Sequence, residues 1–319
     1  AGVGTLIGLI TFQRGQHLLQ GRGEPPAPAQ LAKKSALGIS TEGLIYVGAI
    51  LGVVLVWQII QYQSIVGYLL AAAAAFFIIG LLGFSFTKCS VQERDRMLVA
   101  RALTGFSVLF WTLFEQAGSS LNEFALNNTD LNFFGLFTMN ASQTQSFNPL
   151  FIILCAPLFS ALWTGLGRRG RDLPTPVKFA LALAQVGLGF LVLVYGAGHA
   201  GPDAQVALVW LMLAYLLHTT GELCLSPIGL SMITKLSVFR VMGLMMGVWF
   251  LSAAGAHYLA GQIAQLTVTE SFGGRALDAG AQLAAYQSVF GTIGYMALGF
   301  GAVLLLLAPL LHKRMHGAG

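Results

Sequence analysis

The sequence predicts an all-α polytopic membrane protein, and three observations lead to that fold class. Of the 319 residues, 56% are hydrophobic and only 9% are charged, and the mean hydropathy is +0.74. A soluble domain of ordinary composition has about 25% charged residues. The apolar residues form long runs, and the Lys and Arg residues stand between these runs. A run of about 20 apolar residues is long enough to cross a bilayer as a helix.

Eight apolar runs, bounded by charges or by clusters of Gly and Pro, predict eight membrane-spanning helices. They cover residues 43–60, 65–87, 98–126, 147–166, 176–198, 205–234, 241–266 and 287–311. A further apolar stretch, residues 1–12, has about half the length of a span. We therefore expect a fragment that begins inside a helix.

The polar segment 13–42 separates this first stretch from the first complete run. It contains RGQHLLQGRGEPPAPAQLAKKS, which is basic and rich in Pro and Gly, and it predicts a cytoplasmic linker. Residues 43–87 hold two spans that are joined only by QYQS and have no ionic residue inside them. Helices that face lipid lack such residues, so we expect an accessory transmembrane hairpin. The other six spans lie within residues 97–314.

The basic residues predict the orientation of the chain. When successive connections are assigned to alternate sides of the membrane, sixteen of the seventeen Lys and Arg residues lie on one side, and Arg275 lies on the other. The basic side is the cytoplasmic side. The linker and the C-terminus are therefore expected in the cytoplasm. The net charge of +5 reflects this topology, and nucleic-acid binding is not expected.

Two glutamates stand well inside apolar runs, Glu115 in FWTLFEQ and Glu222 in HTTGELCLSPIGL. A carboxylate at this depth is costly unless it is neutral, paired or surrounded by cavity water. The nearest Lys or Arg to Glu115 in sequence is Arg101, about 21 Å away along a helix. Cationic partners are therefore expected outside this chain or not at all. Carboxylates that can exchange a proton in this setting indicate a proton-coupled carrier.

Helical spacing predicts a polar stripe beside each glutamate. On the face of Glu115 these residues are Trp111, Ser119 and Asn122, and on the face of Glu222 they are His218, Ser226 and Gly229. His218 is either a hydrogen-bonded structural histidine, which we favour, or a second proton carrier. Pro227 is expected to interrupt its helix, as a hinge or as a static kink.

Three stretches in this order resemble the proton-coupled oligopeptide transporters, the peptide branch of the major facilitator superfamily. They are FWTLFEQ, QSFNPLFIILCAPLFSALWTGLGRRG and GELCLSPIGLSMITKLSVFRVMGLMMGVWFLSAA. The resemblance covers nearly the whole chain, from the end of the sixth core span to the twelfth. It implies the C-terminal six-helix bundle of that superfamily plus an accessory two-helix hairpin. The N-terminal six-helix bundle is missing from the chain and becomes an expected partner.

The resemblance also implies residue roles. Glu115 matches the seventh-span glutamate that exchanges salt bridges with a first-helix arginine during gating. Glu222 matches the tenth-span glutamate that faces a fourth-helix lysine near the peptide N-terminus. The substrate-binding residues that it implies are Trp111, Glu115, Asn148, Glu222, Ser226, Trp249, Phe250 and Ser252. Two departures from the family pattern are Val238, in place of a proline, and His257, in place of an asparagine.

The function that this resemblance implies is import of di- and tripeptides with protons by alternating access between the two bundles. Protons are the coupling ion, and no other cofactor is expected. A bacterial inner membrane is the expected location, with the lipid bilayer as solvent. We expect the chain to be inactive by itself, because its carboxylate-lined groove would face lipid.

Other function classes make different demands on the sequence. Members of the same family that carry nitrate or a small metabolite share the fold. Nitrate and small metabolites therefore remain the alternative substrates. An intramembrane enzyme is less well supported, because HExxH, GxSxG and paired aspartates are absent from the sequence. A proton-translocating subunit of a respiratory complex would need a mid-span relay of Lys or His, and the chain has no mid-span Lys. Neither catalytic residues nor a metal site are expected.

Overall fold

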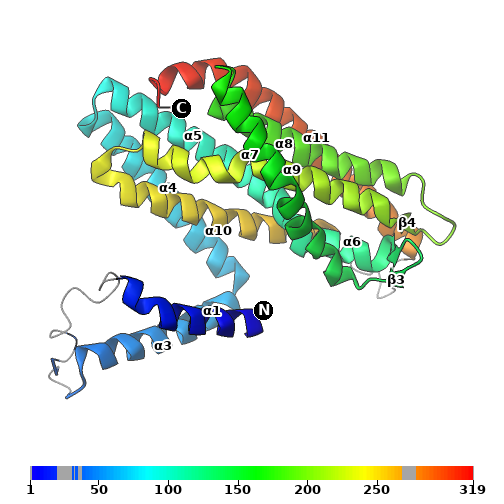
Figure 1. The fold of residues 1–319 in the computed structure, drawn as a ribbon, viewed down its shortest axis with the longest axis horizontal. Helices are drawn as coiled ribbons and strands as arrows, with labels where there is room; N and C mark the ends of the chain where they lie inside the picture. The colour runs from blue at the N-terminus through cyan, green and yellow to red at the C-terminus, as the bar shows by residue number, and fades with distance from the viewer. Residues whose placement is uncertain (1, 20–30, 32, 35–37, 268–277, 319) are drawn as a thin grey trace. The chain divides into compact units, whose positions relative to one another are not determined.

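The computed structural model of the chain describes residues 2–19, 31, 33–34, 38–267 and 278–318 (Figure 1). In that part, eight helices are long and apolar enough to cross a membrane, one for each predicted run. The prediction of an all-α polytopic membrane protein is therefore confirmed. The chain forms two compact units, Ala1–Tyr68 and Leu69–Gly319. Their boundary lies inside helix α4 (Gln63–Lys88), within the predicted hairpin of residues 43–87.

In the first unit, α1 (Gly2–Gly15) precedes a 3-10 turn, η1 (Gln16–Leu19), so the first residues of the predicted linker 13–42 are helical. Residues 20–30, 32 and 35–37 of that linker lie outside the described residues. Helix α3 (Thr41–Ile60) begins where the Ser40 hydroxyl accepts a hydrogen bond from the Gly43 N–H, at 3.0 Å. None of the α3 residues is buried, as expected of a helix that faces lipid.

The second unit contains the rest of α4 and a helical bundle with short strands in its loops. Its helices are α5 (Val91–Phe114), η2 (Glu115–Gly118), α6 (Ser120–Asn128), η3 (Ala141–Ser146), α7 (Phe147–Arg168), α8 (Thr175–Ala197), α9 (Leu208–Leu236), η4 (Phe239–Val241), α10 (Met242–Thr267) and α11 (Ala279–Arg314). Its strands are β1 (Thr129–Asp130), β2 (Asn132–Phe133), β3 (Phe137–Thr138) and β4 (Val206–Ala207). β1 pairs with β4 in parallel, and β2 pairs with β3 in antiparallel fashion.

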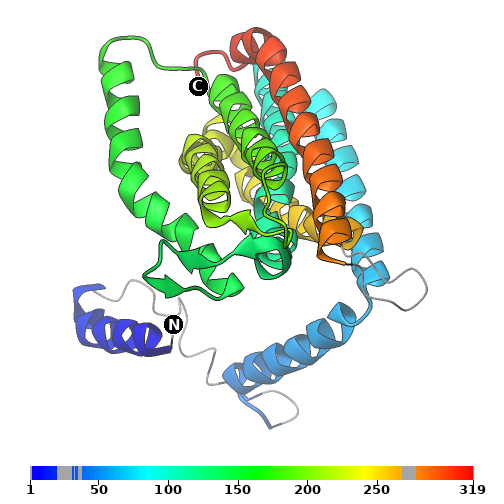
Figure 2. The ribbon, with the colours of Figure 1, turned by 90° about the vertical axis from the view of Figure 1, so that its right-hand side faces the viewer.

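Helix α8 lies between α9 and α11 and forms the most closely packed part of the second unit (Figure 2). Small residues allow this approach, because membrane helices associate most closely where side chains are small. A Cβ atom at Gly187 of α8 would lie 2.8 Å from the carbonyl oxygen of Gly294 and 3.0 Å from the Cβ of Ala297, both on α11. A Cβ at Gly301 would lie 3.2 Å from the carbonyl oxygen of Ala180. The α8–α11 interface is therefore set by backbone contact.

Gly187→Ala is expected to destabilise the bundle by about 1–3 kcal/mol, because the added methyl group forces two helices apart. The measurement is the midpoint of thermal unfolding in detergent. Gly105→Ala is the matched control, since a Cβ at Gly105 of α5 meets no atom within 4 Å. Equal midpoints for the two variants would contradict the packing argument.

The predicted span 98–126 is not one continuous helix. Helix α5 ends at Phe114, Glu115–Gly118 form the 3-10 turn η2, and α6 begins at Ser120. Ser119, between η2 and α6, has φ −130° and ψ −100°, outside the helical region. Adjacent Gly and Ser residues are a usual cause of such breaks. The prediction that Ser119 and Asn122 continue a regular helical stripe from Glu115 was therefore wrong.

Helix α9 runs from Leu208 to Leu236 and includes Pro227, so the proline does not end the helix. A proline inside a helix removes one backbone hydrogen bond, here the bond to the carbonyl of Leu223. Pro227 itself is exposed. Its predicted role as a hinge stays a prediction.

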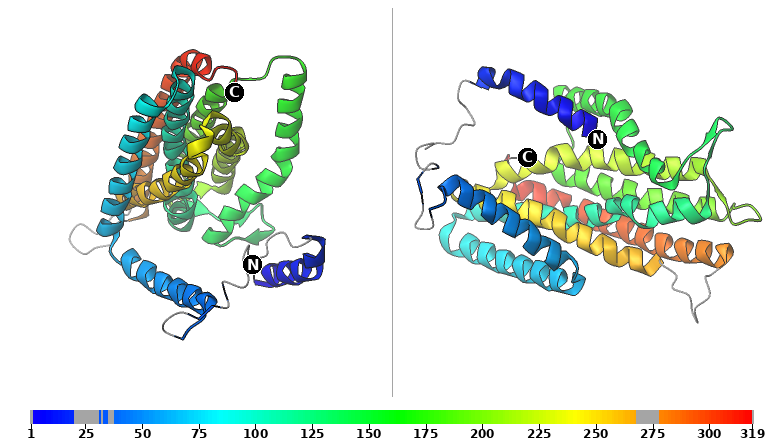
Figure 3. Two further views of the ribbon diagram at one scale, coloured as in Figure 1. Left: turned by 90° about the vertical axis from the view of Figure 1, so that its left-hand side faces the viewer. Right: turned by 90° about the horizontal axis from the view of Figure 1, so that it is seen from below.

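Two helices lie at the edge of the bundle. Helix α7 contacts α9 and η3, and Phe147 is its one buried residue (Figure 2). Helix α10 packs against α5 and, over fewer residues, against α9 (Figure 3). The strands β3 and β4 lie at the same end of the bundle as α6 (Figure 1). The candidate site lies among α5, α7, α9 and α10.

Candidate functional site

Glu115 stands at the junction of α5 and η2, and its side chain is about one third exposed (32%). Its Oε2 lies 3.4 Å from Nδ1 of His257 on α10. This contact is an ion pair when the imidazole is protonated. The expectation that a partner for Glu115 would come from outside the chain was therefore incomplete. A search for Lys and Arg alone missed it, although His257 was already visible as a departure from the family pattern.

The α5–α10 contact that positions this pair depends on a buried glutamine. Nε2 of Gln116 donates hydrogen bonds to the carbonyl oxygens of Thr112, at 3.1 Å, and of Ala260 on α10, at 3.2 Å. Its Oε1 accepts a hydrogen bond from the Ser120 hydroxyl at 2.6 Å. Because Gln116 follows Glu115 directly, its bonds fix the turn from which the carboxylate projects.

Glu222 on α9 is held by the predicted substrate residue Asn148. Nδ2 of Asn148 donates hydrogen bonds to Oε2 of Glu222 and to the hydroxyl of Thr219, both at 3.1 Å. The Thr219 hydroxyl in turn donates to the carbonyl oxygen of Tyr215 at 2.7 Å. The first turn of α7 is thereby connected to the middle of α9. Thr219 had no signal in the sequence beyond its position three residues before Glu222.

Glu115, at the C-terminal end of α5, and Glu222, on α9, belong to two helices that contact each other. Two like charges repel, so the pair is most stable when one of them is neutral or bound to a cation. Two carboxylates in one site therefore favour a positively charged ligand.

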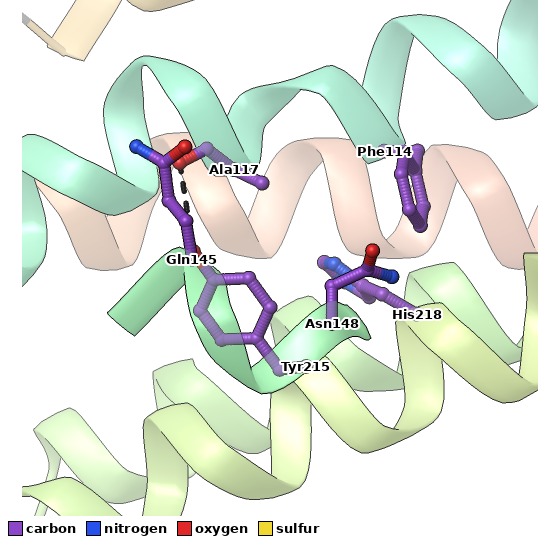
Figure 4. A pocket seen from close by; sticks show the side chains of 6 residues that line it. All are labelled: Phe114, Ala117, Gln145, Asn148, Tyr215 and His218. Atoms are coloured by element: carbon purple, nitrogen blue, oxygen red, sulfur yellow. Dashed lines mark hydrogen bonds between the residues drawn. The ribbon is translucent and has the colours of Figure 1, made fainter. Parts of the chain in front are cut away.

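A small cavity lies beside Asn148, with a volume of about 120 Å³ (Figure 4). It is lined by Phe114, Ala117, Gln145, Asn148, Tyr215 and His218. The Tyr215 hydroxyl donates a long hydrogen bond, 3.5 Å, to the carbonyl oxygen of Ala117. The cavity is lined by both apolar and polar side chains. It is large enough for water molecules or for part of a ligand.

His218 lines this cavity and is buried, with only 1% of its surface exposed. Its Nε2 lies 3.1 Å from the carbonyl oxygen of Val186 and donates to it, which places the lone pair of a neutral ring on Nδ1. The ring lies 4.8 Å from the centre of Phe190. Its Nδ1 has no partner among the described residues. The hydrogen bond to Val186 agrees with the structural interpretation that we favoured for His218.

The aromatic candidates of α5 and α10 lie in different surroundings. Trp111 packs edge to face on Phe114 at 5.3 Å, within α5. Trp249 packs directly on α9, because a Cβ at Gly229 would lie 2.5 Å from its ring. Phe250, the next residue, is 62% exposed and so faces away from this contact. The structure thus separates the neighbouring residues of the WFLS stretch.

The two serine candidates differ in their contacts. The Ser252 hydroxyl donates to the carbonyl oxygen of Trp249 at 2.6 Å, within α10. Ser226 lies on α9 beside Pro227 and is partly buried.

No group of three His, Cys, Asp or Glu side chains with metal-ligand geometry occurs among the described residues. The roles of both serines and of Trp111, Trp249 and Phe250 stay predictions.

Ionisable groups on the inner faces of membrane-spanning helices line the pathways of transported ions and substrates. The fold and the site therefore define a membrane transport protein. The chain belongs to the POT family, whose sequence model matches residues 1–277. This is the family that the three sequence motifs resemble, so that prediction is confirmed.

Relatives with sequences similar to this chain are described as transporters. An uncharacterised transporter YclF of Bacillus subtilis is 35% identical, with 99% of this chain and 61% of the relative covered. The dipeptide and tripeptide permease A of Edwardsiella piscicida is 34% identical, with 99% and 62% covered. The chain thus spans about three fifths of the length of these relatives.

Solved structures show the same fold. A peptide transporter POT in complex with sulfate has 31% sequence identity and a TM-score of 0.70, with 99% of this chain and 61% of that chain covered. A POT family transporter in complex with 5-aminolevulinic acid has 26% identity and a TM-score of 0.72, with 97% and 61% covered.

Proposed function

We propose that this chain is the C-terminal part of a proton-coupled transporter that imports di- and tripeptides. The observation that carries the proposal is that both intramembrane carboxylates have partners in the site, Glu222 in Asn148 and Glu115 in His257. Family membership and the permease names of relatives support the substrate class.

The amino terminus of a peptide suits Glu222. A charge-assisted hydrogen bond to an ammonium group is about twice as strong as a neutral one. Asn148 holds Oε2 of the carboxylate in place and leaves the second oxygen, Oε1, for the ligand. Recognition of the terminus and backbone, and not of one side chain, is compatible with many different peptides.

The carboxyl terminus of the peptide needs a positive group on the opposite side of the site. The site residues of α5, α7, α9 and α10 described above include no Lys or Arg. A second bundle, N-terminal to this one, would supply that charge. Alternating access then follows from rocking of the two bundles about a site near the midplane of the membrane.

Proton coupling would act through Glu115. While Glu115 is ionised, it attracts either His257 of its own bundle or a cation of the opposite bundle. Protonation of Glu115 removes both attractions and releases the latch between the bundles. An inward proton gradient favours this protonation on the outer side and so gives import its direction. A bacterial inner membrane, with the linker and the C-terminus in the cytoplasm, supplies such a gradient.

The proposal is tested by uptake into proteoliposomes that hold the transporter formed by this chain and an N-terminal six-helix bundle. With an inward proton gradient, we expect a labelled dipeptide to be concentrated and labelled nitrate not to be. Collapse of the gradient with an ionophore should abolish the concentration of peptide. Uptake of nitrate without peptide would replace the proposed substrate class, and peptide uptake by this chain alone would refute the need for a second bundle.

A further inference from the structure

Basic side chains of the second unit converge on the last turn of α4. The Arg101 guanidinium, from α5, donates a hydrogen bond through Nη2 to the hydroxyl of Ser85 at 3.0 Å. The Arg94 guanidinium, also from α5, lies 5.4 Å from the centre of the Phe86 ring. With two further residues they form a group that we call the α4 basic cluster: Lys88, Arg94, Arg101 and Arg240.

Arg240 reaches the same turn from η4, more than a hundred residues later in the chain. Its Nη2 donates a hydrogen bond to the carbonyl oxygen of Lys88 at 3.1 Å, and its guanidinium lies 5.8 Å from the centre of the Phe84 ring. Three elements, α4, α5 and η4, therefore contribute positive charge around the last turn of α4.

Carboxylates do not balance this charge. The ion pairs among the described residues join Lys178 to Asp172, His257 to Glu115 and His316 to Asp95, so none includes a member of the cluster. Two acids flank Arg94 in the chain: Asp95, which pairs with His316, and the capping residue Glu93. Its Oε2 accepts the backbone N–H of Ser90 at 2.8 Å, in the cap of α5.

The thiol of Cys89, between α4 and α5, is affected by the charges of Arg101, Arg240 and Glu93. Burial and the charge of Glu93 raise the pKa of this thiol, while the charges of Arg240 and Arg101 act in the opposite direction. Four basic groups against two adjacent carboxylates, Glu93 and Asp95, leave an excess of positive charge.

Arg101 adds to this excess from inside the protein. Its Nε and Nη1 are shielded from solvent and have no acceptor among the described residues. A partly buried charge without a counter-ion is costly, and an anion close to it offsets part of that cost. An anionic ligand that binds at the cluster would therefore be stabilised by this charge.

An exposed apolar stripe leads along α4 to the cluster. Phe76, Ile79 and Phe86 lie on one face of this helix and are 72%, 70% and 60% exposed. A ligand with a negative head and apolar chains matches this combination, and basic pockets at the cytoplasmic ends of membrane helices bind lipid headgroups. We propose that the α4 basic cluster binds the headgroup phosphate of an anionic phospholipid, whose acyl chains lie along this stripe.

The test compares ligands that share a phosphate. The transporter containing this chain, purified in neutral detergent, is heated with phosphatidylglycerol, with phosphatidylcholine or with inorganic phosphate. We expect phosphatidylglycerol alone to raise the unfolding midpoint, by roughly 2–4 °C. An equal rise with phosphatidylcholine would overturn the preference for an anionic lipid. An equal rise with inorganic phosphate would replace the lipid by a free anion.

Variants locate the site. Arg240→Gln changes an exposed side chain and should abolish the rise. Arg168→Gln, at the exposed end of α7 and on the same predicted side of the membrane, should keep it. Native mass spectrometry provides a second readout, since Arg240→Gln should retain at least one phosphatidylglycerol molecule fewer than Arg168→Gln. Equal midpoints and equal lipid retention for both variants would overturn the proposal.

Discussion

Glu115→Gln is expected to abolish proton-driven accumulation of a dipeptide while peptide exchange across the membrane continues. Glutamine keeps the size of the side chain and can accept a hydrogen bond from His257, but it cannot take up the coupling proton. The measurement is uptake with an inward proton gradient, compared with counterflow in vesicles preloaded with unlabelled peptide. Accumulation should fall to the level that the wild type reaches without a gradient.

Two further variants sharpen this result. Glu123→Gln changes an exposed glutamate on α6 by the same chemistry, and it should accumulate peptide as the wild type does. His257→Gln removes the imidazole that lies 3.4 Å from Glu115 but leaves the carboxylate in place. It should still accumulate peptide, because the carboxylate that takes up the coupling proton is unchanged. If Glu115→Gln accumulated peptide normally, another group would have to carry the proton.

Glu222→Gln is expected to weaken peptide binding by about 10-fold to 150-fold. This range corresponds to the 1.5–3 kcal/mol that a hydrogen bond to a charged group contributes. The amide of glutamine can still contact Asn148, so the link between α7 and α9 should survive. The measurement is the concentration of unlabelled dipeptide that halves counterflow of the labelled one.

A blocked peptide is the control for Glu222. An N-acetylated dipeptide has no ammonium group, so the wild type and Glu222→Gln should bind it equally weakly. If the variant weakened the blocked and the free peptide by the same factor, Glu222 would act through the structure of the site and not through the amino terminus.

The fold could be predicted well from composition and apolar run length, because both follow from the bilayer as solvent. Each of the eight predicted runs coincides with a helical segment, although the run 98–126 is divided between α5, η2 and α6. The break at Glu115–Gly118 could not be read from the same pattern, since Gly118 and the following serines are tolerated inside many membrane helices. The bonds of Gln116 to α10 that accompany this break are tertiary contacts, and periodicity along one helix does not report them.

The candidate site was predicted as separate residues, and only part of its arrangement followed. The resemblance supplied Asn148 and Glu222, but their hydrogen bond depends on how α7 crosses α9. His257 appeared only as an unusual residue, because its distance to Glu115 depends on the packing of α10 against α5. For Phe250 and Trp249, adjacent positions on a helix point in directions about 100° apart, so a shared motif did not imply a shared surface.

Under the proposed alternating-access mechanism, the backbone contact between α8 and α11 has a mechanical consequence for this bundle. Helices that touch through glycines cannot slide without separating, so α8, α9 and α11 should move as one stiff slab. Helices α7 and α10 hold Asn148 and His257 and are attached at the edge of this slab. Bending within this bundle should therefore be concentrated in α7 and α10, the helices that carry the partners of both carboxylates. Occupancy of the site and the shape of the bundle would then be coupled.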